Sequence, residues 1–365
     1  MSNQIDRKLG KTLREDFKRG DFRRTVRRDF KELKEFFLDD QRRDRLANMG
    51  WFKRWFFMFV WLLKSLFLKL TPARRLLLLA GVVLILISGS TGYQGEDVQF
   101  NSDSAIAGGL FILFVLMLEL KDKLLAHQEL ETGRAVQRAL MPEESPEMPG
   151  WSLWLFTRPA NDVGGDLVDF QRMYNDRFGA ALGDVAGKGL GAALFMARLQ
   201  ATLRALSPDF RSLAELGAKL NQIFYRDGLA NKFASLVYLD FQSQSALVRV
   251  LNAGHFPPLV IKSDGTIEEM SKGAMALGIS ANAAYTEQEI ALAGGDLLLI
   301  YSDGVTEARN TDGEFFGEQR LREMLPALTG MTPKQAGEIV LTEVDRFIDD
   351  ARANDDLSLV VLKRE

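Results

Sequence analysis

Two apolar runs with almost no charge are the strongest constraint on the fold. Residues 76–92 (LLLLAGVVLILISGSTG) and 104–120 (SAIAGGLFILFVLMLEL) follow each other closely along the chain. A membrane-spanning helix needs about 20 apolar residues, and about 17 is near the lower limit. Because the two runs are in tandem and follow an aromatic, basic segment, we favour a transmembrane hairpin (74–120) over two buried core helices. The first run begins too far along the chain to be a cleaved signal peptide.

The charges that flank the two runs predict an orientation. Arg74 and Arg75 precede the first run and Lys121 and Lys123 follow the second, whereas the connecting loop YQGEDVQFNSDS has neither Lys nor Arg. Cytoplasmic loops carry an excess of positive charge. We therefore expect a multi-pass protein of the inner (cytoplasmic) membrane, with both termini in the cytoplasm. The outer loop, about ten residues long, is too short to fold as a sensor domain.

The N-terminal part is basic. Residues 1–75 contain 21 Lys or Arg and 10 Asp or Glu, whereas the rest of the chain contains 25 Lys or Arg and 39 Asp or Glu. We expect residues 1–50 to form a charged, helical cytoplasmic region, either solvated or lying on anionic lipid. In residues 51–70 the basic positions fall within about 160° of a helical wheel. This pattern predicts an amphipathic helix in the interface of a lipid bilayer, with a short spanning helix as the alternative.

The remaining chain is predicted to contain a linker helix and a soluble domain. The helix, residues 121–142, should end by Pro142, and it offers a surface for a homodimer. Residues 150–365 mix short strands with longer helices, which predicts a layered α+β domain. We expect strands at 152–158, 178–182, 234–241, 246–252, 257–262, 297–301 and 357–362, and helices at 189–206, 212–226, 317–328 and 333–349.

Aspartates next to glycines or to one another adjoin several of these strands. They are Asp166 in NDVGGDLVDF, Asp184 in ALGDVAGKG, Asp303 in YSDG, and Asp355 and Asp356 in ANDDL. Strand ends that lie side by side would bring these carboxylates together, and their charges would repel. Divalent cations relieve such repulsion. The chain has no cysteine and two histidines, so any metal site must consist mainly of oxygen ligands, which suit Mg²⁺ or Mn²⁺.

Two other interpretations of these motifs fail at named positions. A phosphate-binding P-loop needs Gly, four residues, then Gly-Lys-Ser/Thr. In this chain Gly187-Lys188 is followed by Gly189, and Leu182 stands where the first glycine should be. The segment GGDLVDF also lacks the two adjacent acids and following Phe of a diguanylate cyclase signature. No nucleic-acid partner is expected.

Six motifs in order resemble a known enzyme family. They are AVQRALMPE, PANDVGGDLVDF, GDVAGKGLGAALFMA, NAGHFPPLV, LLIYSDGVTEARNTDGEFFG and DDLSLVVL, and they cover residues 134–362. The stretch resembles the SpoIIE/RsbU-like branch of the PPM-type, metal-dependent serine/threonine protein phosphatases. The resemblance implies an αββα sandwich of two antiparallel sheets flanked by helices. It also implies hydrolysis of phosphoserine or phosphothreonine on a cytoplasmic regulatory protein, typically a STAS-type anti-sigma-factor antagonist, by a metal-bridged water.

The resemblance assigns roles to individual residues. Asp184 matches the aspartate that bridges two Mn²⁺ or Mg²⁺ ions, and the backbone carbonyl of Val185 matches a further metal contact. Asp303 and Asp355 match ligands of the first ion, and Asp166 matches a ligand of the second. Asp184 and Asp303 would thus act in catalysis through metal-bound water. Asp356 is a further candidate metal ligand, with a role through water or through contacts to the ligands as the alternative, and Asp169 is expected to act in the second of these ways.

The sequence departs from the wider superfamily near the phosphate. It has Ala186 in the region after Asp184 where a histidine is usual, and its nearest upstream arginine is Arg158. His255 and Lys188 are the candidates for the general acid, although His255 also suits a hydrogen-bonded turn residue. The alternative function is a catalytically silent membrane scaffold or partner-binding pseudo-phosphatase. The presence of Asp at all four matching metal positions argues against it.

Overall fold

The computed structural model describes residues 49–88, 102–227, 232–349, 351 and 353–365. The predictions for residues 1–48 and for the outer loop lie outside these residues. The chain divides into two compact units, Met1–Leu124 and Leu125–Glu365.

The first unit contains three described helices, and each contacts the next along the chain. α4 (Trp51–Lys69) ends where Leu70 adopts an extended backbone, and Arg75 of α5 (Pro72–Ser88) donates from Nε to the Phe67 carbonyl at 3.0 Å. α5 packs on the beginning of α6 (Ser102–Leu140). A Cβ on Gly108 would lie 2.5 Å from the Gly81 carbonyl oxygen, so only glycine permits this approach.

One described helix meets the length and composition of a membrane span. It lies within Ser104–Leu140, whereas α5 has 17 described residues. The transmembrane hairpin therefore stays a prediction. α6 runs without a break from Ser102 to Leu140, so the second predicted span and the predicted linker helix are one continuous helix.

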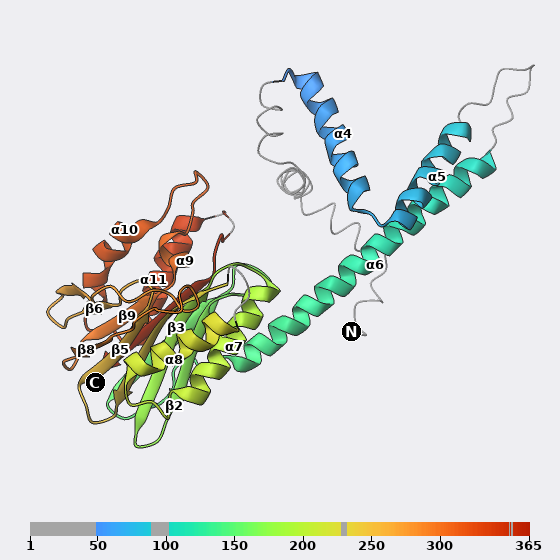
Figure 1. Cartoon of the computed structure of the whole chain (residues 1–365). Coiled ribbons are helices and arrows are strands. Elements are labelled where there is room, and N and C mark those ends of the chain that lie inside the picture. The colour runs from blue at the N-terminus through green and yellow to red at the C-terminus, as the bar shows by residue number, and fades with distance from the viewer. Residues whose placement is uncertain (1–48, 89–101, 228–231, 350, 352) are drawn as a thin grey trace, which may run out of the picture. The chain divides into compact units, whose positions relative to one another are not determined.

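The second unit is a sandwich of two antiparallel sheets, each with five described strands (Figure 1). One sheet has the order β1-β10-β9-β6-β7 and the other β2-β3-β4-β5-β8. This arrangement confirms the predicted αββα sandwich. The strands are β1 (Trp151–Arg158), β2 (Leu167–Arg172), β3 (Arg177–Val185), β4 (Ala234–Gln242), β5 (Leu247–Ala253), β6 (Leu259–Ile261), β7 (Ile267–Glu269), β8 (Glu287–Ala291), β9 (Leu297–Tyr301) and β10 (Leu357–Arg364).

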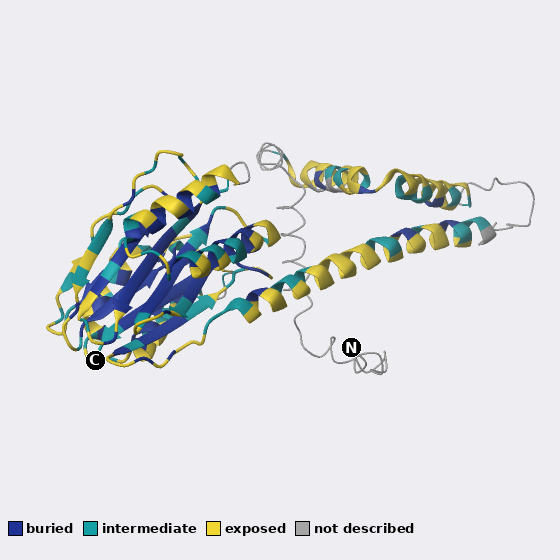
Figure 2. Ribbon diagram, turned by 60° about the horizontal axis from the view of Figure 1, so that its bottom comes forward, coloured by how far each residue is buried: buried dark blue, intermediate teal, exposed yellow. Residues whose placement is uncertain are grey.

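Helices cover both outer faces of the sandwich. Strand residues facing inward from both sheets, such as Leu155, Leu182 and Val360, form the central core. The outer face of one sheet packs on α7 (Leu190–Leu206) and α8 (Leu213–Arg226). The outer face of the other packs on α9 (Asp303–Thr306), α10 (Gly317–Met324), the 3₁₀ helix η1 (Leu325–Leu328) and α11 (Pro333–Ile348). In Figure 2 the strands are accordingly mostly dark blue, the colour of buried residues.

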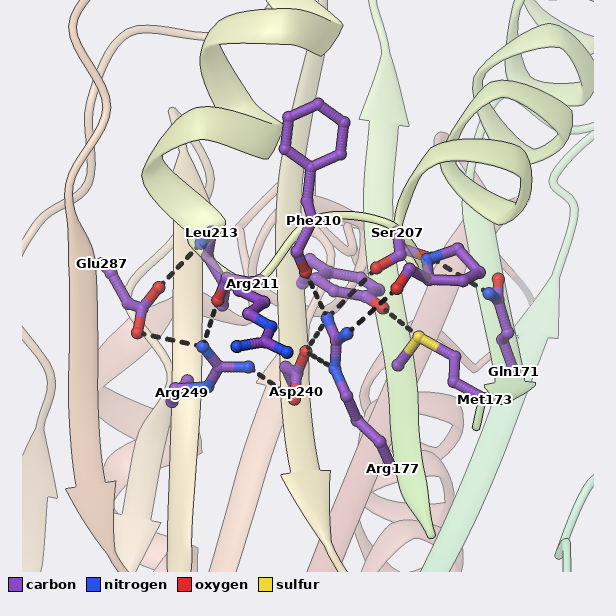
Figure 3. A network of polar contacts seen from close by, with 12 residues as sticks. Gln171, Met173, Arg177, Ser207, Phe210, Arg211, Leu213, Asp240, Arg249 and Glu287 are labelled. Atoms are coloured by element: carbon purple, nitrogen blue, oxygen red, sulfur yellow. Dashed lines mark hydrogen bonds and ion pairs between the residues drawn. The ribbon is translucent and has the colours of Figure 1, made fainter. Parts of the chain in front are cut away.

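A buried ion-pair network holds the α7–α8 connection on the second sheet (Figure 3). Asp240 is 1% exposed and accepts from Arg177 Nε at 2.6 Å and from Arg249 Nη2 at 3.0 Å. Arg177 also donates to the carbonyls of Ser207 and Phe210 within the connection. The carboxylate and both guanidinium groups are paired, and these pairings offset part of the cost of removing the charges from water.

Candidate metal centre

The predicted acids of the second sheet lie at one end of the β2–β3 hairpin. Asp166 directly precedes β2, and Asp184 is the penultimate residue of β3. The strands are antiparallel with Leu167 opposite Gly183, so the start of β2 lies beside the end of β3. The hairpin register therefore places the two aspartates next to each other.

The acids of the first sheet occupy the equivalent end of β9 and β10. Asp303 begins α9 two residues after β9 ends, and Asp355 and Asp356 directly precede β10. Leu359 of β10 pairs with Tyr301 of β9, which brings the end of one strand beside the start of the other.

Two buried serines connect these strand ends across the sandwich. Ser358 donates from Oγ to Asp166 Oδ2 at 2.5 Å, and its backbone N–H donates to Ser302 Oγ at 2.9 Å. The Ser302 hydroxyl in turn donates to the Asp356 carbonyl at 3.0 Å. The hydroxyls thus hold the acidic ends of β2, β9 and β10 in one place.

The negative charges of these carboxylates raise one another's pKa. Burial raises the pKa of Asp166 well above its ordinary value, and the neighbouring charge of Asp184 raises it further. Burial, followed by the charges of Asp355 and Asp356, raises the pKa of Asp184. Burial, Asp184 and Asp355 together raise the pKa of Asp303 to about 7. The structure therefore brings Asp166, Asp184, Asp303 and Asp355 together, with more negative charge than the surrounding protein neutralises.

This donor set fits hard divalent cations. Crowded carboxylates with raised pKa values are what a divalent cation stabilises in the ionised form. Among the described residues, however, no three His, Cys, Asp or Glu side chains are placed so that they could hold a metal ion together. Asp355 instead accepts from Lys188 Nζ at 2.9 Å. The side chains have to adjust when a cation enters.

The carboxylate of Asp356 organises the loop before β2. Its Oδ1 accepts from Ala160 N–H at 2.8 Å and its Oδ2 from Gly165 N–H at 2.6 Å. A Cβ on Gly164 would lie 2.7 Å from Oδ2, so this approach requires glycine. Since both carboxylate oxygens already accept hydrogen bonds, Asp356 is better suited to placing the Asp166 loop than to binding metal directly.

The other predicted positions lie in different surroundings. A Cβ on Gly165 would come within 3.3 Å of the Val185 carbonyl oxygen, so glycine leaves space beside that carbonyl. Asp169 lies outside the acid cluster: it accepts from Arg204 Nε at 2.9 Å and from Gln200 Nε2 at 3.0 Å. These contacts fasten α7 to β2.

Both ring nitrogens of His255 are engaged. Nδ1 lies 2.7 Å from Ser235 Oγ and Nε2 lies 3.1 Å from the Tyr301 carbonyl. Burial lowers the pKa of His255 to about 4, so the ring is neutral at pH 7. These contacts favour the turn-residue alternative over a general acid.

Sequence reasoning missed three polar residues of the site region. Ser302 and Ser358 were inside the quoted motifs but were given no role, although a serine within the apolar strand LSLVVL is a signal for a buried hydrogen bond. Gln137, 5% exposed on α6, was missed as well. Its side chain donates to the Gly164 carbonyl at 2.9 Å and accepts from the Gly164 N–H at 3.1 Å. The end of α6 is therefore bonded to the loop that carries Asp166.

An open pocket of about 430 Å³ adjoins the acids. Asp184 and Asp303 are among the residues that line it. The other lining residues are Phe233, Ser235, Gly254, His255, Phe256, Pro257, Lys272 and Gly273.

Sequence comparisons identify related proteins. The model of the family described as stage II sporulation protein E (SpoIIE) matches residues 174–365. The chain is 28% identical over 305 residues to protein IcfG of Synechocystis sp., covering 76% of this chain and 48% of IcfG. It is 26% identical over 240 residues to phosphoserine phosphatase RsbU of Bacillus subtilis, covering 65% of this chain and 70% of RsbU. The chain thus spans about half the length of IcfG.

Solved structures share the fold. The SiaA PP2C domain of Pseudomonas aeruginosa superposes with a TM-score of 0.57 at 18% identity, covering 67% of this chain and 99% of that domain. The structure of the PP2C phosphatase domain with a fragment of the regulatory domain of SpoIIE from Bacillus subtilis superposes with a TM-score of 0.52 at 18% identity. The match covers 61% of this chain and 65% of that chain. At these identities the likeness establishes the sandwich fold alone.

Proposed function

Because this chain belongs to the stage II sporulation protein E (SpoIIE) family of PP2C-type serine phosphatases, we propose that it hydrolyses phosphoserine or phosphothreonine on a cytoplasmic regulatory protein. The observation that carries this proposal is the convergence of four aspartates beside an open pocket. A STAS-type anti-sigma-factor antagonist is the proposed substrate class.

The reaction replaces the serine–phosphate ester with a bond to water. Oxygen of water attacks phosphorus, the bond from phosphorus to the serine oxygen breaks, and the serine oxygen receives a proton. Two Mn²⁺ or Mg²⁺ ions, when bound, would supply the charge that activates the water and neutralises the phosphoryl oxygens. In the proposal Asp166, Asp184, Asp303 and Asp355, together with the Val185 carbonyl, would hold the ions.

The chain's own residues position these groups. Ser358 orients Asp166, and Asp356 fixes the loop from Ala160 to Asp166. We give His255 no proton-transfer role because both ring nitrogens are engaged and its pKa is lowered.

Phosphate release tests the proposal. The full chain, purified in detergent, is expected to release phosphate from a phosphoserine protein with Mn²⁺ present and to lose this activity in excess chelator. Asp184→Asn should lower turnover by at least about 100-fold, because the bridging charge is lost. A well-folded wild-type chain that binds Mn²⁺ and a phosphoprotein without releasing phosphate would support the scaffold alternative instead.

We also propose that α5 and α6 anchor the enzyme in the inner membrane as a hairpin, with the phosphatase domain in the cytoplasm. The apolar composition of α6 and the close Gly81–Gly108 contact support this. Since the chain has no cysteine, single Cys substitutions can report topology. In intact cells an impermeant maleimide should label Gln94→Cys but not Ser145→Cys, and the reverse pattern would overturn the orientation.

A homodimer through α6 is proposed on the exposed apolar side chains of its cytoplasmic half. Leu125 is 49% exposed and Val136 is 57% exposed. In a parallel pair, Val136→Cys should form an intermolecular disulfide in membranes under mild oxidation. Tyr174→Cys, on an exposed turn away from the helix, is the matched control and should stay monomeric.

A further inference from the structure

Three basic side chains near the acids are already bound to protein groups. Arg158 donates from Nη1 to Asp345 Oδ2 on α11 at 3.0 Å. Lys232 donates to the Ala186 carbonyl at 2.9 Å. Lys188 donates to Asp355 and to the Asn354 carbonyl. In this structure all three groups thus have protein partners; a cation that takes Asp355 would leave Lys188 with the Asn354 carbonyl alone, so Lys188→Met is compared below.

Lys272 differs from these three residues. It is exposed and lines the pocket together with Asp184 and Asp303. Its ammonium group makes no hydrogen bond or ion pair with any residue that the structure describes. Apart from the neutral ring of His255, it contributes the one basic side chain in the described lining of this pocket.

The backbone beside Lys272 is fixed against the end of β5. A Cβ on Gly273 would lie 2.2 Å from the Asn252 carbonyl oxygen, so the chain passes Asn252 at a distance that only glycine permits. Ala274 N–H donates to that carbonyl at 2.9 Å. The Asn252 side chain also binds the backbone N–H and carbonyl of His255. The base of the Lys272 side chain is therefore anchored at the pocket wall, while its ammonium remains free.

On the basis of the proposed phosphatase activity, we propose that Lys272 binds the phosphoryl group of the substrate from the pocket side. A phosphoserine side chain is close to dianionic at pH 7 and offers three acceptor oxygens. A lysine ammonium binds such a group as a mobile point charge with three donors. Lys272 thereby supplies positive charge beside the phosphoryl group, a role that Arg158 does not fill while it is paired with Asp345.

Inhibition by inorganic phosphate tests this assignment on the full chain. With Mn²⁺ present, Lys272→Met should raise the inhibition constant of phosphate about 10-fold to 100-fold, the range for one charge-assisted hydrogen bond. The KM for p-nitrophenyl phosphate should rise in parallel. Lys272→Arg should stay within about threefold of wild type, since it keeps the charge and the donors. Mn²⁺ affinity, measured by calorimetry, should be unchanged in both variants.

Further comparisons distinguish a failure of the Lys272 assignment from a failure of the proposed phosphatase activity. Lys219→Met, on α8 and outside the pocket, removes the same charge and should leave the phosphate constant unchanged. An unchanged constant in Lys272→Met, or a rise seen only in Lys188→Met, would overturn the assignment to Lys272 while the phosphatase activity stands. A wild-type chain that binds Mn²⁺ but hydrolyses nothing would instead overturn the proposed function itself.

Discussion

Ser358 donates a hydrogen bond of 2.5 Å to Asp166, although the two residues are 192 positions apart in the sequence. Ser358 is the second residue of β10 in one sheet, whereas Asp166 precedes β2 in the other. The bond therefore ties the two sheets together at the acidic end of the sandwich. It also acts to lower the pKa of Asp166, against the effect of burial.

Removal of this hydroxyl should weaken metal binding. In Ser358→Ala the Asp166 carboxylate loses a donor, so its ionised form becomes less favourable and a cation has to displace a more tightly held proton. We expect Mn²⁺ affinity to fall about 10-fold, in line with other outer contacts of metal ligands. Calorimetric titration with Mn²⁺ measures this. Ser152→Ala on β1, far along the strand from the acids, is the matched control, and an equal loss there would contradict the explanation.

Stabilisation by metal should depend on pH. Burial and the charges of Asp184 and Asp355 raise the pKa of Asp303 to about 7. A carboxyl group with a raised pKa stabilises the metal-free fold at acid pH, and this contribution is lost as pH rises through about 7. A bound cation replaces the proton. The increase in Tm produced by Mn²⁺ should therefore be larger at pH 7.5 than at pH 5.5.

The Asp303→Asn variant provides the control for this pH dependence. It has no carboxyl group to titrate at that position, so its metal-free Tm should vary less with pH between 5.5 and 7.5. If the wild type and the variant show the same pH profile, Asp303 is not the group responsible.

The sequence predicted the sandwich better than it predicted the details of the site. Strong apolar strands such as 297–301 were placed correctly because their pattern is local. β2 was missed, since its residues follow two glycines and carry Asp169, a pattern that resembles a turn. Roles that depend on long-range contacts were also missed. Nothing near Asp356 in the chain indicates that its carboxylate binds the N–H of Gly165, and nothing near Ser358 indicates Asp166.

The buried pair around Asp240 should matter far more to stability than an exposed pair. Asp240→Ala leaves the largely buried Arg177 without a carboxylate, while Arg249 keeps Glu287; loss of one partner of a buried pair typically costs about 3–5 kcal/mol. Asp345→Ala removes the partner of Arg158 from a half-exposed pair and should cost less than about 1 kcal/mol. Urea unfolding of both variants gives the comparison. Similar losses of unfolding free energy would show that the network in Figure 3 is not a stability element.

Acid should destabilise the fold through His255. Burial lowers the pKa of this ring to about 4, whereas an unfolded chain takes up the proton near pH 6.5. A histidine with a lowered pKa favours folding above its unfolded pKa, and this advantage is lost as pH falls from about 6.5 to about 4. The full shift corresponds to about 3 kcal/mol.

The difference between the wild type and His255→Asn isolates this effect, because other titrating groups contribute equally to both proteins. Asparagine does not titrate, and its side-chain amide retains a polar atom near the position of Nδ1, which faces Ser235. The unfolding free energy of the wild type should exceed that of the variant most at pH 7, and the gap should narrow steadily toward pH 4.5. A gap that stays constant over this range would mean that the ring does not gain a proton on unfolding, and that its burial as the neutral form is not what holds the turn.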